Sequence, residues 1–113
     1  IDYNVIYGNI NGIFMKKLTS SQRSYLKKCA HHIDPIVHIG KNGLSTGTKK
    51  SINNALEAKE LIKIKFLNFK EKKKKYAEDI CASENCHIIG IVGNIVILFR
   101  QQLDKEKQNY KLL

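Results

Sequence analysis

Residues 35–50 constrain the fold most, because they read as a strand, a tight turn and a helix start in direct succession. The β-branched run over 36–39 favours a short strand. The sequence Gly-Lys-Asn-Gly at 40–43 forms the turn, and Ser45 or Thr46 then supplies a helix N-cap. A strand that passes directly into a helix in this way is typical of an α/β architecture.

Hydrophobic periodicity extends this pattern over the rest of the chain. Thr19 and Gln22 form a capping-box pattern before the first helix, and Gly93-Asn94 reads as a two-residue hairpin turn. The predicted helices cover 20–31, 46–59 and 71–83, and the predicted strands cover 36–39, 61–67, 87–92 and 95–100. The expected fold is therefore a single compact α-β-α-β-α-β-β domain of the α/β class, a four-stranded mixed sheet with packed helices.

Length and composition indicate one folded domain with short flanking segments. The chain has 113 residues and 42% hydrophobic residues, which supports one modest core. We expect an N-terminal extension over 1–14, a folded domain over 15–100 and a frayed or helical tail over 101–113. Three cysteines without framework spacing indicate a reducing compartment. We expect the cytoplasm, or an organelle (plastid or mitochondrion) if the chain comes from a eukaryote. No apolar run approaches the length of a membrane span.

Positive charge is concentrated in the folded part. The formal net charge is +10, and residues 15–100 hold 17 Lys or Arg against 7 Asp or Glu. This balance indicates a polyanionic partner, with RNA, DNA or an anionic membrane surface as candidates. Lysine outnumbers arginine 18 to 2. Because lysines act as point charges, attraction to phosphates should dominate over bidentate reading of bases.

The turn at 40–43 has the features of a phosphate site. Gly40 and Gly43 carry no Cβ that would keep a ligand away, Lys41 adds a cation, and Asn42 adds a donor or a residue that tolerates a left-handed conformation. The helix that follows points free N–H groups at the same place. The spacing fits neither a Walker A loop nor a dinucleotide fingerprint. A plain strand-to-helix connection is the alternative reading of the same four residues.

Further basic residues extend the predicted interface. Lys49 and Lys50 follow the turn on the second helix, and we expect Lys27 and Lys28 on the first helix to lie beside them. His31 closes the first helix and is a further candidate for RNA contact. Lys63 and Lys65 alternate with apolar residues, so they predict a wet sheet face that offers a second candidate surface. The lysine run over 70–75 is either a solvated helix start or part of the interface.

Catalytic and metal sites are not indicated. Cys81, Cys86 and His87 lack the spacing of a zinc site, so we interpret the cysteines as core residues and the histidines as surface residues. No nucleophile–base pair stands out, and Asp34, Glu57 and Glu60 read as cap, solvent and loop residues. We therefore expect no enzyme, no metal and no cofactor.

These stretches, taken in order, resemble the CRM domain, the YhbY-like family of RNA-binding proteins. The resemblance covers about Leu18 to Arg100. The stretches that carry it are Leu18-Thr-x-x-Gln22, Ala30-His31, Pro35 through Leu44 with Gly47, Ala55-Leu56-Glu57, Glu60 through Lys65, Ile89-Gly90, and Leu98-Phe99-Arg100.

The resemblance implies a fold similar to the C-terminal domain of a bacterial translation initiation factor, with RNA bound through the G-x-x-G loop. Stand-alone bacterial members are linked to precursors of the large ribosomal subunit, and plant organellar members promote group II intron splicing. The expected function is RNA binding in large-subunit assembly, by a monomer with ribosomal RNA or a pre-ribosomal particle as partner and no membrane contact. The alternatives are an organellar splicing factor and a structural ribosome-associated interaction module.

Overall fold

The computed structural model describes residues 9–10, 13–14 and 17–112, and it confirms the predicted order of elements. Most of the predicted extension over 1–14 lies outside the described residues. Within it, β1 (Asn9–Ile10) and β2 (Ile13–Phe14) pair antiparallel, which the sequence did not predict. The other elements are α1 (Ser20–Ala30), β3 (Pro35–Ile39), α2 (Thr46–Lys59), β4 (Leu61–Phe66), the 3-10 helix η1 (Lys70–Lys72), α3 (Lys73–Glu84), β5 (His87–Val92), β6 (Ile95–Phe99) and the 3-10 helix η2 (Lys105–Lys107).

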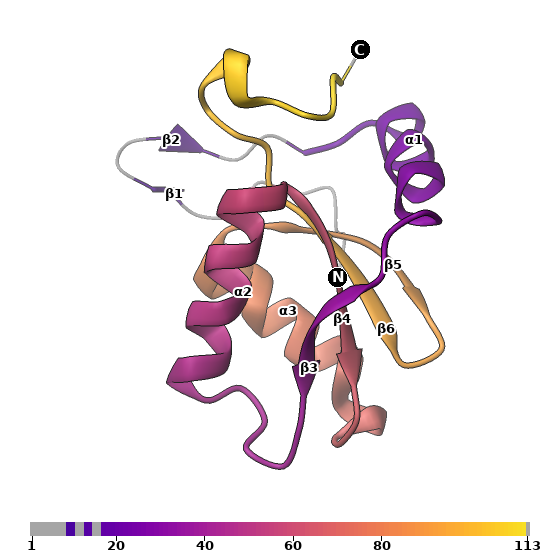
Figure 1. The fold of residues 1–113 in the computed structure, drawn as a ribbon, viewed down its shortest axis with the longest axis vertical. Coiled ribbons are helices and arrows are strands. Elements are labelled where there is room, and N and C mark those ends of the chain that lie inside the picture. Colours follow the sequence, from indigo (N-terminus) through magenta and orange to yellow (C-terminus); the bar gives the residue numbers. More distant parts are fainter. Residues whose placement is uncertain (1–8, 11–12, 15–16, 113) are drawn as a thin grey trace.

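Four strands form one mixed sheet in the order β3-β4-β6-β5 (Figure 1). β3 and β4 run parallel and are connected by α2, whereas β6 is antiparallel to both of its neighbours. Because the carboxyl ends of parallel strands meet at one edge of a sheet, the turn after β3 and the segment after β4 leave the sheet side by side. We call this the carboxyl edge; it lies at the bottom of Figure 1.

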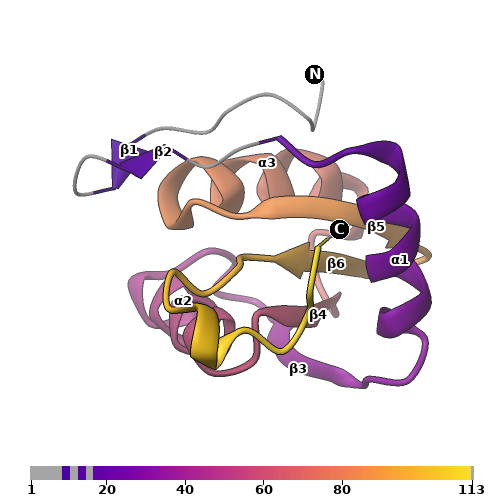
Figure 2. The same ribbon diagram turned by 90° about the horizontal axis from the view of Figure 1, so that it is seen from above.

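The helices cover the two faces of the sheet unequally, as Figure 2 shows from above. α2 and α3 pack on one face, where the larger apolar cluster includes Ile52, Leu56, Ile64, Phe66 and Ile80. α1 packs on the other face over a smaller cluster that includes Leu26, Ala30, Ile89, Ile97 and Phe99. The alternation of β4 explains this arrangement, because successive side chains of a strand point to opposite faces.

Local sequence signals set the ends of the helices. Thr19 and Gln22 form the predicted capping box, with the Thr19 N–H donating to Gln22 Oε1 at 2.9 Å and the Gln22 N–H donating to Thr19 Oγ1 at 3.1 Å. Ser45 is the N-cap of α2, and its hydroxyl accepts from the Thr48 N–H at 3.2 Å. Of the two residues that the sequence offered for this cap, the structure uses Ser45.

The C-terminal segment docks on the domain. Tyr110 and Leu112 pack against the smaller apolar cluster, and the Tyr110 ring meets Phe99 edge-on at a centroid distance of 6.2 Å. Glu60 attaches the segment to the domain by a hydrogen bond. Its side chain is fully buried and accepts the Gln102 N–H at 2.7 Å. The prediction of a frayed or helical tail is therefore wrong apart from η2. Glu60 lies in the connection between α2 and β4, as predicted, but its side chain is buried and anchors the C-terminal segment.

Candidate nucleic-acid interface

The turn at the carboxyl edge closes through one backbone hydrogen bond, in which the Gly43 N–H donates to the Gly40 carbonyl at 3.0 Å. Lys41 and Asn42 stand at its tip and are both exposed. The left-handed conformation falls on Gly43, with φ 57°, and not on Asn42, so of the two roles predicted for Asn42 the role of a donor remains. A Cβ built on Gly40 has no neighbour within 4 Å. The turn therefore exposes its charged tip and leaves open space beside Gly40.

The start of α2 adds two open donors next to this tip. Thr48 and Lys49 donate their N–H groups to Ser45, whereas within the described part of the chain the N–H groups of Thr46 and Gly47 have no acceptor. No acidic side chain occupies the first turn of α2. Unpaired N–H groups and the positive end of a helix dipole attract anions. The first turn of α2 thus has the geometry of a phosphate-binding helix end.

Lysines supply the cations that remain available to a ligand. Arg23 donates to the carbonyls of Ile88 and Ile89 at 2.6 and 3.2 Å, so its guanidinium is committed to the fold. Arg100 donates to the Glu84 carbonyl at 2.6 Å and pairs with Glu57 at 3.0 Å. Among the described residues no lysine forms an ion pair with a carboxylate. In the described part of the chain the lysine charges are therefore not neutralised by carboxylates, while both arginines act structurally.

The predicted site residues divide between two surfaces. The loop surface consists of the turn and the start of α2, namely Gly40, Lys41, Asn42, Gly43, Lys49 and Lys50. The sheet-face surface lies on the side of α1. Lys65 is exposed there beside His38 of β3, Lys63 is half-buried, and the Lys27 Cε atom lies 3.0 Å from the position of a Cβ on Gly90.

The expectation that Lys27 and Lys28 lie beside Lys49 and Lys50 is wrong, because α1 and α2 pack on opposite faces of the sheet (Figure 2). His31 caps the C-terminal end of α1, before β3 begins. The five residues of β3 separate it from the turn by about 16 Å at the usual rise of a strand. His31, Lys27 and Lys28 therefore do not belong to the loop surface.

Phe69 belongs to the carboxyl edge and was missed by the sequence analysis. It adopts a left-handed conformation, φ 56° and ψ 36°, which costs a bulky residue on the order of 1–2 kcal/mol. Its ring packs 5.5 Å from the Tyr76 ring, and its Cε2 atom lies 3.3 Å from the position of a Cβ on Gly43. The sequence gives no signal for this conformation, since Asn68 is the residue that ordinarily adopts it.

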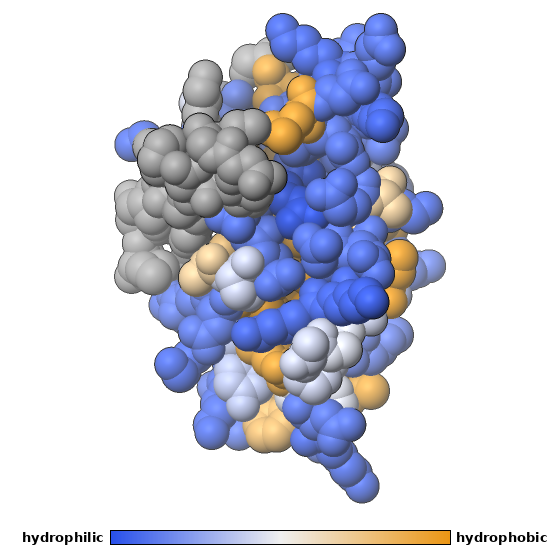
Figure 3. Space-filling model, turned by 90° about the vertical axis from the view of Figure 1, so that its left-hand side faces the viewer, coloured by the Kyte–Doolittle hydropathy of each residue, from blue (hydrophilic) through white to orange (hydrophobic). Residues whose placement is uncertain are grey.

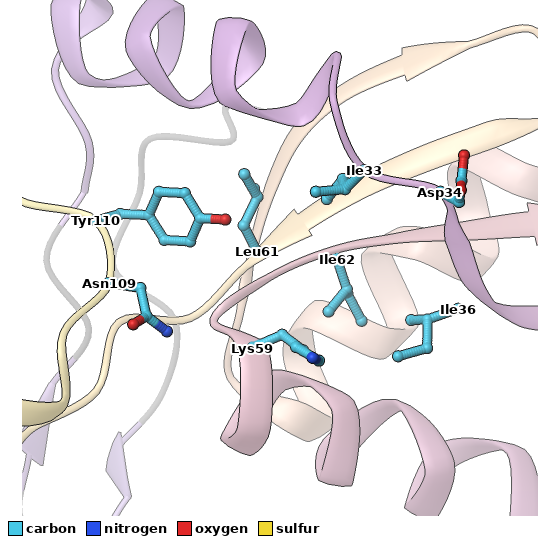
Figure 4. A pocket seen from close by; sticks show the side chains of 8 residues that line it. All are labelled: Ile33, Asp34, Ile36, Lys59, Leu61, Ile62, Asn109 and Tyr110. Atoms are coloured by element: carbon cyan, nitrogen blue, oxygen red, sulfur yellow. The ribbon is translucent and has the colours of Figure 1, made fainter.

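A shallow hollow of about 340 Å³ lies at the opposite edge of the sheet (Figure 4). Its lining residues are Ile33, Asp34, Ile36, Lys59, Leu61, Ile62, Asn109 and Tyr110. Asp34 and Lys59 are the charged residues among them, and the lining holds no nucleophile. This hollow offers neither the charge nor the open donors of the loop surface.

Cys81, Cys86 and His87 are core residues, whereas Cys29 is half-buried against the smaller apolar cluster. The thiols of Cys81 and Cys86 are buried with their sulfurs 3.3 Å apart, and their contact together with burial raises the pKa of Cys81. His87 is 3% exposed, which corrects its assignment to the surface, and burial together with nearby Arg23 lowers its pKa to about 4. The described residues contain no group of three or more side chains suited to a metal ion.

The surface on the side of α2 is mainly hydrophilic, with apolar residues in small separate spots (Figure 3). No helix in the described part of the chain has the length and apolar character needed to cross a membrane. The coloured part of this face is thus mainly polar.

Comparison with known proteins places this geometry in a family. Residues 18–100 match the sequence profile of the CRS1 / YhbY (CRM) domain. "Probable RNA-binding protein YqeI" of Bacillus subtilis is 34% identical over 91 residues, which cover 80% of this chain and 95% of that protein. An "RNA-binding protein" of Haemophilus influenzae is 36% identical over 87 residues, which cover 76% of this chain and 88% of that protein.

A solved structure agrees with these sequence matches. The solution structure of the hypothetical protein SAV1595 from Staphylococcus aureus superimposes with a TM-score of 0.69 at 33% identity, covering 83% of this chain and 99% of that one. The profile match spans all of the four-stranded sheet and its three helices. The chain therefore belongs to the CRS1/YhbY (CRM) domain family.

Proposed function

We propose that this protein binds RNA through the loop surface and acts in assembly of the large ribosomal subunit, by binding and not by catalysis, as a monomer. The observations that carry the proposal are the exposed Lys41 at the tip of the turn and the open N–H groups of Thr46 and Gly47 at the start of α2, a few residues further along the chain. Two open donors, the positive end of a helix dipole and a nearby cation on the same strand-to-helix connection match the charge and hydrogen-bonding needs of a phosphate group.

The choice of RNA rests on the family. Two of the bacterial relatives bear names that describe RNA binding, and the matches cover 95% and 88% of their lengths. The large-subunit precursor is the RNA class to which the resemblance to stand-alone bacterial members points. The fold supports this indirectly, because it places exposed lysines at the carboxyl edge.

Binding of this kind should follow the phosphate backbone. Lys49 and Lys50 continue the track of positive charge along the first turns of α2, Lys50 exposed and Lys49 half-buried. Because ammonium groups act as point charges, they position a strand without reading its bases. Sequence preference would then come from the shape of the RNA and not from base contacts.

The test is the paired substitution Lys41→Asp and Asn42→Asp, which places negative charge at the phosphate position and leaves both glycines intact. Affinity for a fragment of large-subunit ribosomal RNA should fall at least tenfold, since a mispaired charge contact costs on the order of 1–3 kcal/mol. The control is Lys105→Asp with Lys107→Gln, which removes the same total charge from the exposed η2 at the opposite end of the molecule (Figure 1).

Two outcomes would contradict the proposal. If the loop variant binds RNA like the wild type while its circular dichroism spectrum is unchanged, the turn is a plain connection. If the wild type binds only assembled particles and no free RNA, the protein is an interaction module of the ribosome.

A further inference from the structure

The β4–α3 segment carries the densest positive charge of the described chain. Residues 70–75 contain five lysines and one carboxylate, that of Glu71. Of the lysines, only Lys73 is half-buried, and the others are exposed. Neither η1 nor α3 has a side-chain cap, and within the described residues none of these lysines is paired. Cations at the start of a helix oppose its dipole, so the stability of α3 does not explain them.

The fold joins this segment to the turn by direct contacts. The Leu67 and Asn68 N–H groups both donate to the Ile39 carbonyl, at 2.9 and 3.1 Å, so the chain leaves β4 against the last residue of β3. Phe69 then places its ring beside Gly43. Lys70 and η1 follow immediately, and Figure 1 shows η1 and the turn at the same lower end of the molecule.

The left-handed backbone of Phe69 sets the direction in which the chain continues from β4 into η1. A bulky residue holds such a conformation only where its surroundings enforce it, and such residues gather at functional sites. Here the conformation turns the chain from β4 into η1 and lays the ring between Gly43 and Tyr76. Gly43 is itself left-handed, and the Phe69 ring occupies the space beside it that a Cβ would need.

We propose that the exposed lysines of 70–75, here called the lysine arm, bind the phosphates of the same RNA strand next to those held by the loop surface, and that Phe69 is the positioning residue that fixes the arm relative to the turn. This inference rests on the proposed function and adds a second contact region to it. The arm lies on the carboxyl edge together with the turn, whereas Lys27 and Lys65 lie on the sheet face.

Charge removal tests the arm. Lys72→Gln with Lys74→Gln should lower the slope of log affinity against log salt by about 1.4, at about 0.7 for each lost contact with a single strand. The matched control is Lys105→Gln with Lys107→Gln, which has the same spacing, the same exposure and the same loss of charge on η2. That control should leave the slope within error of the wild type.

The outcomes separate the two proposals. If the arm variant and the control variant show the same salt slope while the Lys41→Asp, Asn42→Asp variant loses binding, the proposal for the lysine arm is overturned and the proposed function stands. If the loop variant retains full affinity, the proposed function fails whatever the arm does.

An uncharged substitution tests Phe69. Phe69→Leu keeps an apolar side chain and removes the ring atoms that approach Gly43. It should lower the salt slope as the arm variant does, although it removes no charge, and adding Lys72→Gln and Lys74→Gln should change the slope little further. Phe69→Tyr, which keeps the ring, should retain the wild-type slope. A wild-type slope in a folded Phe69→Leu protein would overturn the positioning role, and should Phe69→Leu fail to fold, a lowered slope in Phe69→Tyr would overturn it instead.

Discussion

Glu60 accepts a hydrogen bond from the Asn109 N–H at 2.5 Å, across 49 positions of sequence. The same carboxylate accepts the Gln102 N–H, and the Glu60 carbonyl accepts the Arg100 N–H at 2.9 Å. These bonds compensate for a buried charge and for a backbone φ of 66°. Glu60 thereby attaches the C-terminal segment to the end of α2.

Replacing Glu60 with Gln should release this segment. A carboxylate that accepts two backbone N–H groups contributes about 1.5–3 kcal/mol for each such bond, so we expect a loss of at least about 2 kcal/mol in the free energy of unfolding. Urea denaturation would measure it. The matched control is Glu57→Gln, whose exposed ion pair with Arg100 should account for no more than about 1 kcal/mol. Equal losses in the two variants would contradict the anchoring role.

His87 makes stability depend on pH. Its pKa is lowered from 6.5 to about 4 in the folded protein, chiefly by burial and then by Arg23. Between these values the unfolded chain binds a proton that the folded chain does not, so the contribution is complete above pH 6.5 and is lost as pH falls toward 4. The loss should approach about 3 kcal/mol, at 1.36 kcal/mol per unit. Unfolding curves of the wild type and of His87→Gln at several pH values would isolate the contribution of His87. Parallel pH profiles of the free energy of unfolding in the two proteins would contradict it.

The two turn glycines should respond differently to alanine. Gly43→Ala places a Cβ at a φ of 57° and against Phe69, so stability should fall by about 1–2 kcal/mol. Gly40→Ala adds a Cβ in open space, so the melting temperature should hold while RNA affinity falls, because the methyl group obstructs the approach of the backbone. Thermal melts and a binding titration of both variants decide this. Unchanged affinity in Gly40→Ala would place the RNA elsewhere.

The separation of the two basic surfaces gives a fourth prediction. Lys49→Glu with Lys50→Glu should weaken RNA binding by at least tenfold with nearly unchanged thermal stability, because both side chains adjoin the turn and neither forms an ion pair. Lys27→Glu with Lys28→Glu makes the same change of charge on the other face and should affect binding less. The reverse order would assign the interface to the sheet face around Lys63 and Lys65. Filter binding at physiological salt would rank the variants.

Local signals in the sequence were sufficient to predict the elements and much of the turn. The capping box at Thr19, the strand-turn-helix unit at 35–50 and the alternation of β4 depend on neighbouring residues, and the structure confirms each of them. The hairpin at Gly93 behaves likewise, with φ 58° at the first turn position. Such features are readable because the residues that cause them lie within a few positions of one another.

The errors concern contacts between distant parts of the chain. Whether Lys27 adjoins Lys49 depends on which face of the sheet each helix covers, and periodicity does not specify the face. The burial of Glu60 depends on a segment more than 40 residues away. The conformation of Phe69 depends on Gly43 and Tyr76. In each case the decisive partner is brought in by tertiary packing, which no short pattern of residues encodes.

The shared direction of β3 and β4 has a consequence for how fast a partner is met. α2 and α3 both start at the carboxyl edge, while Asp34, Glu57, Glu84, Asp104 and Glu106 all lie toward the other end of the strands. Because Lys59, Arg100, Lys105 and Lys107 lie at that same end, the carboxylates there offset these cations, and the excess positive charge is left toward the carboxyl edge. We therefore expect the charge distribution to have a dipole component. Such a dipole is rotated by the field of a polyanion during diffusion, which raises the fraction of encounters that are correctly oriented. We therefore expect the topology of the sheet, by orienting this charge, to raise the association rate constant for a polyanion.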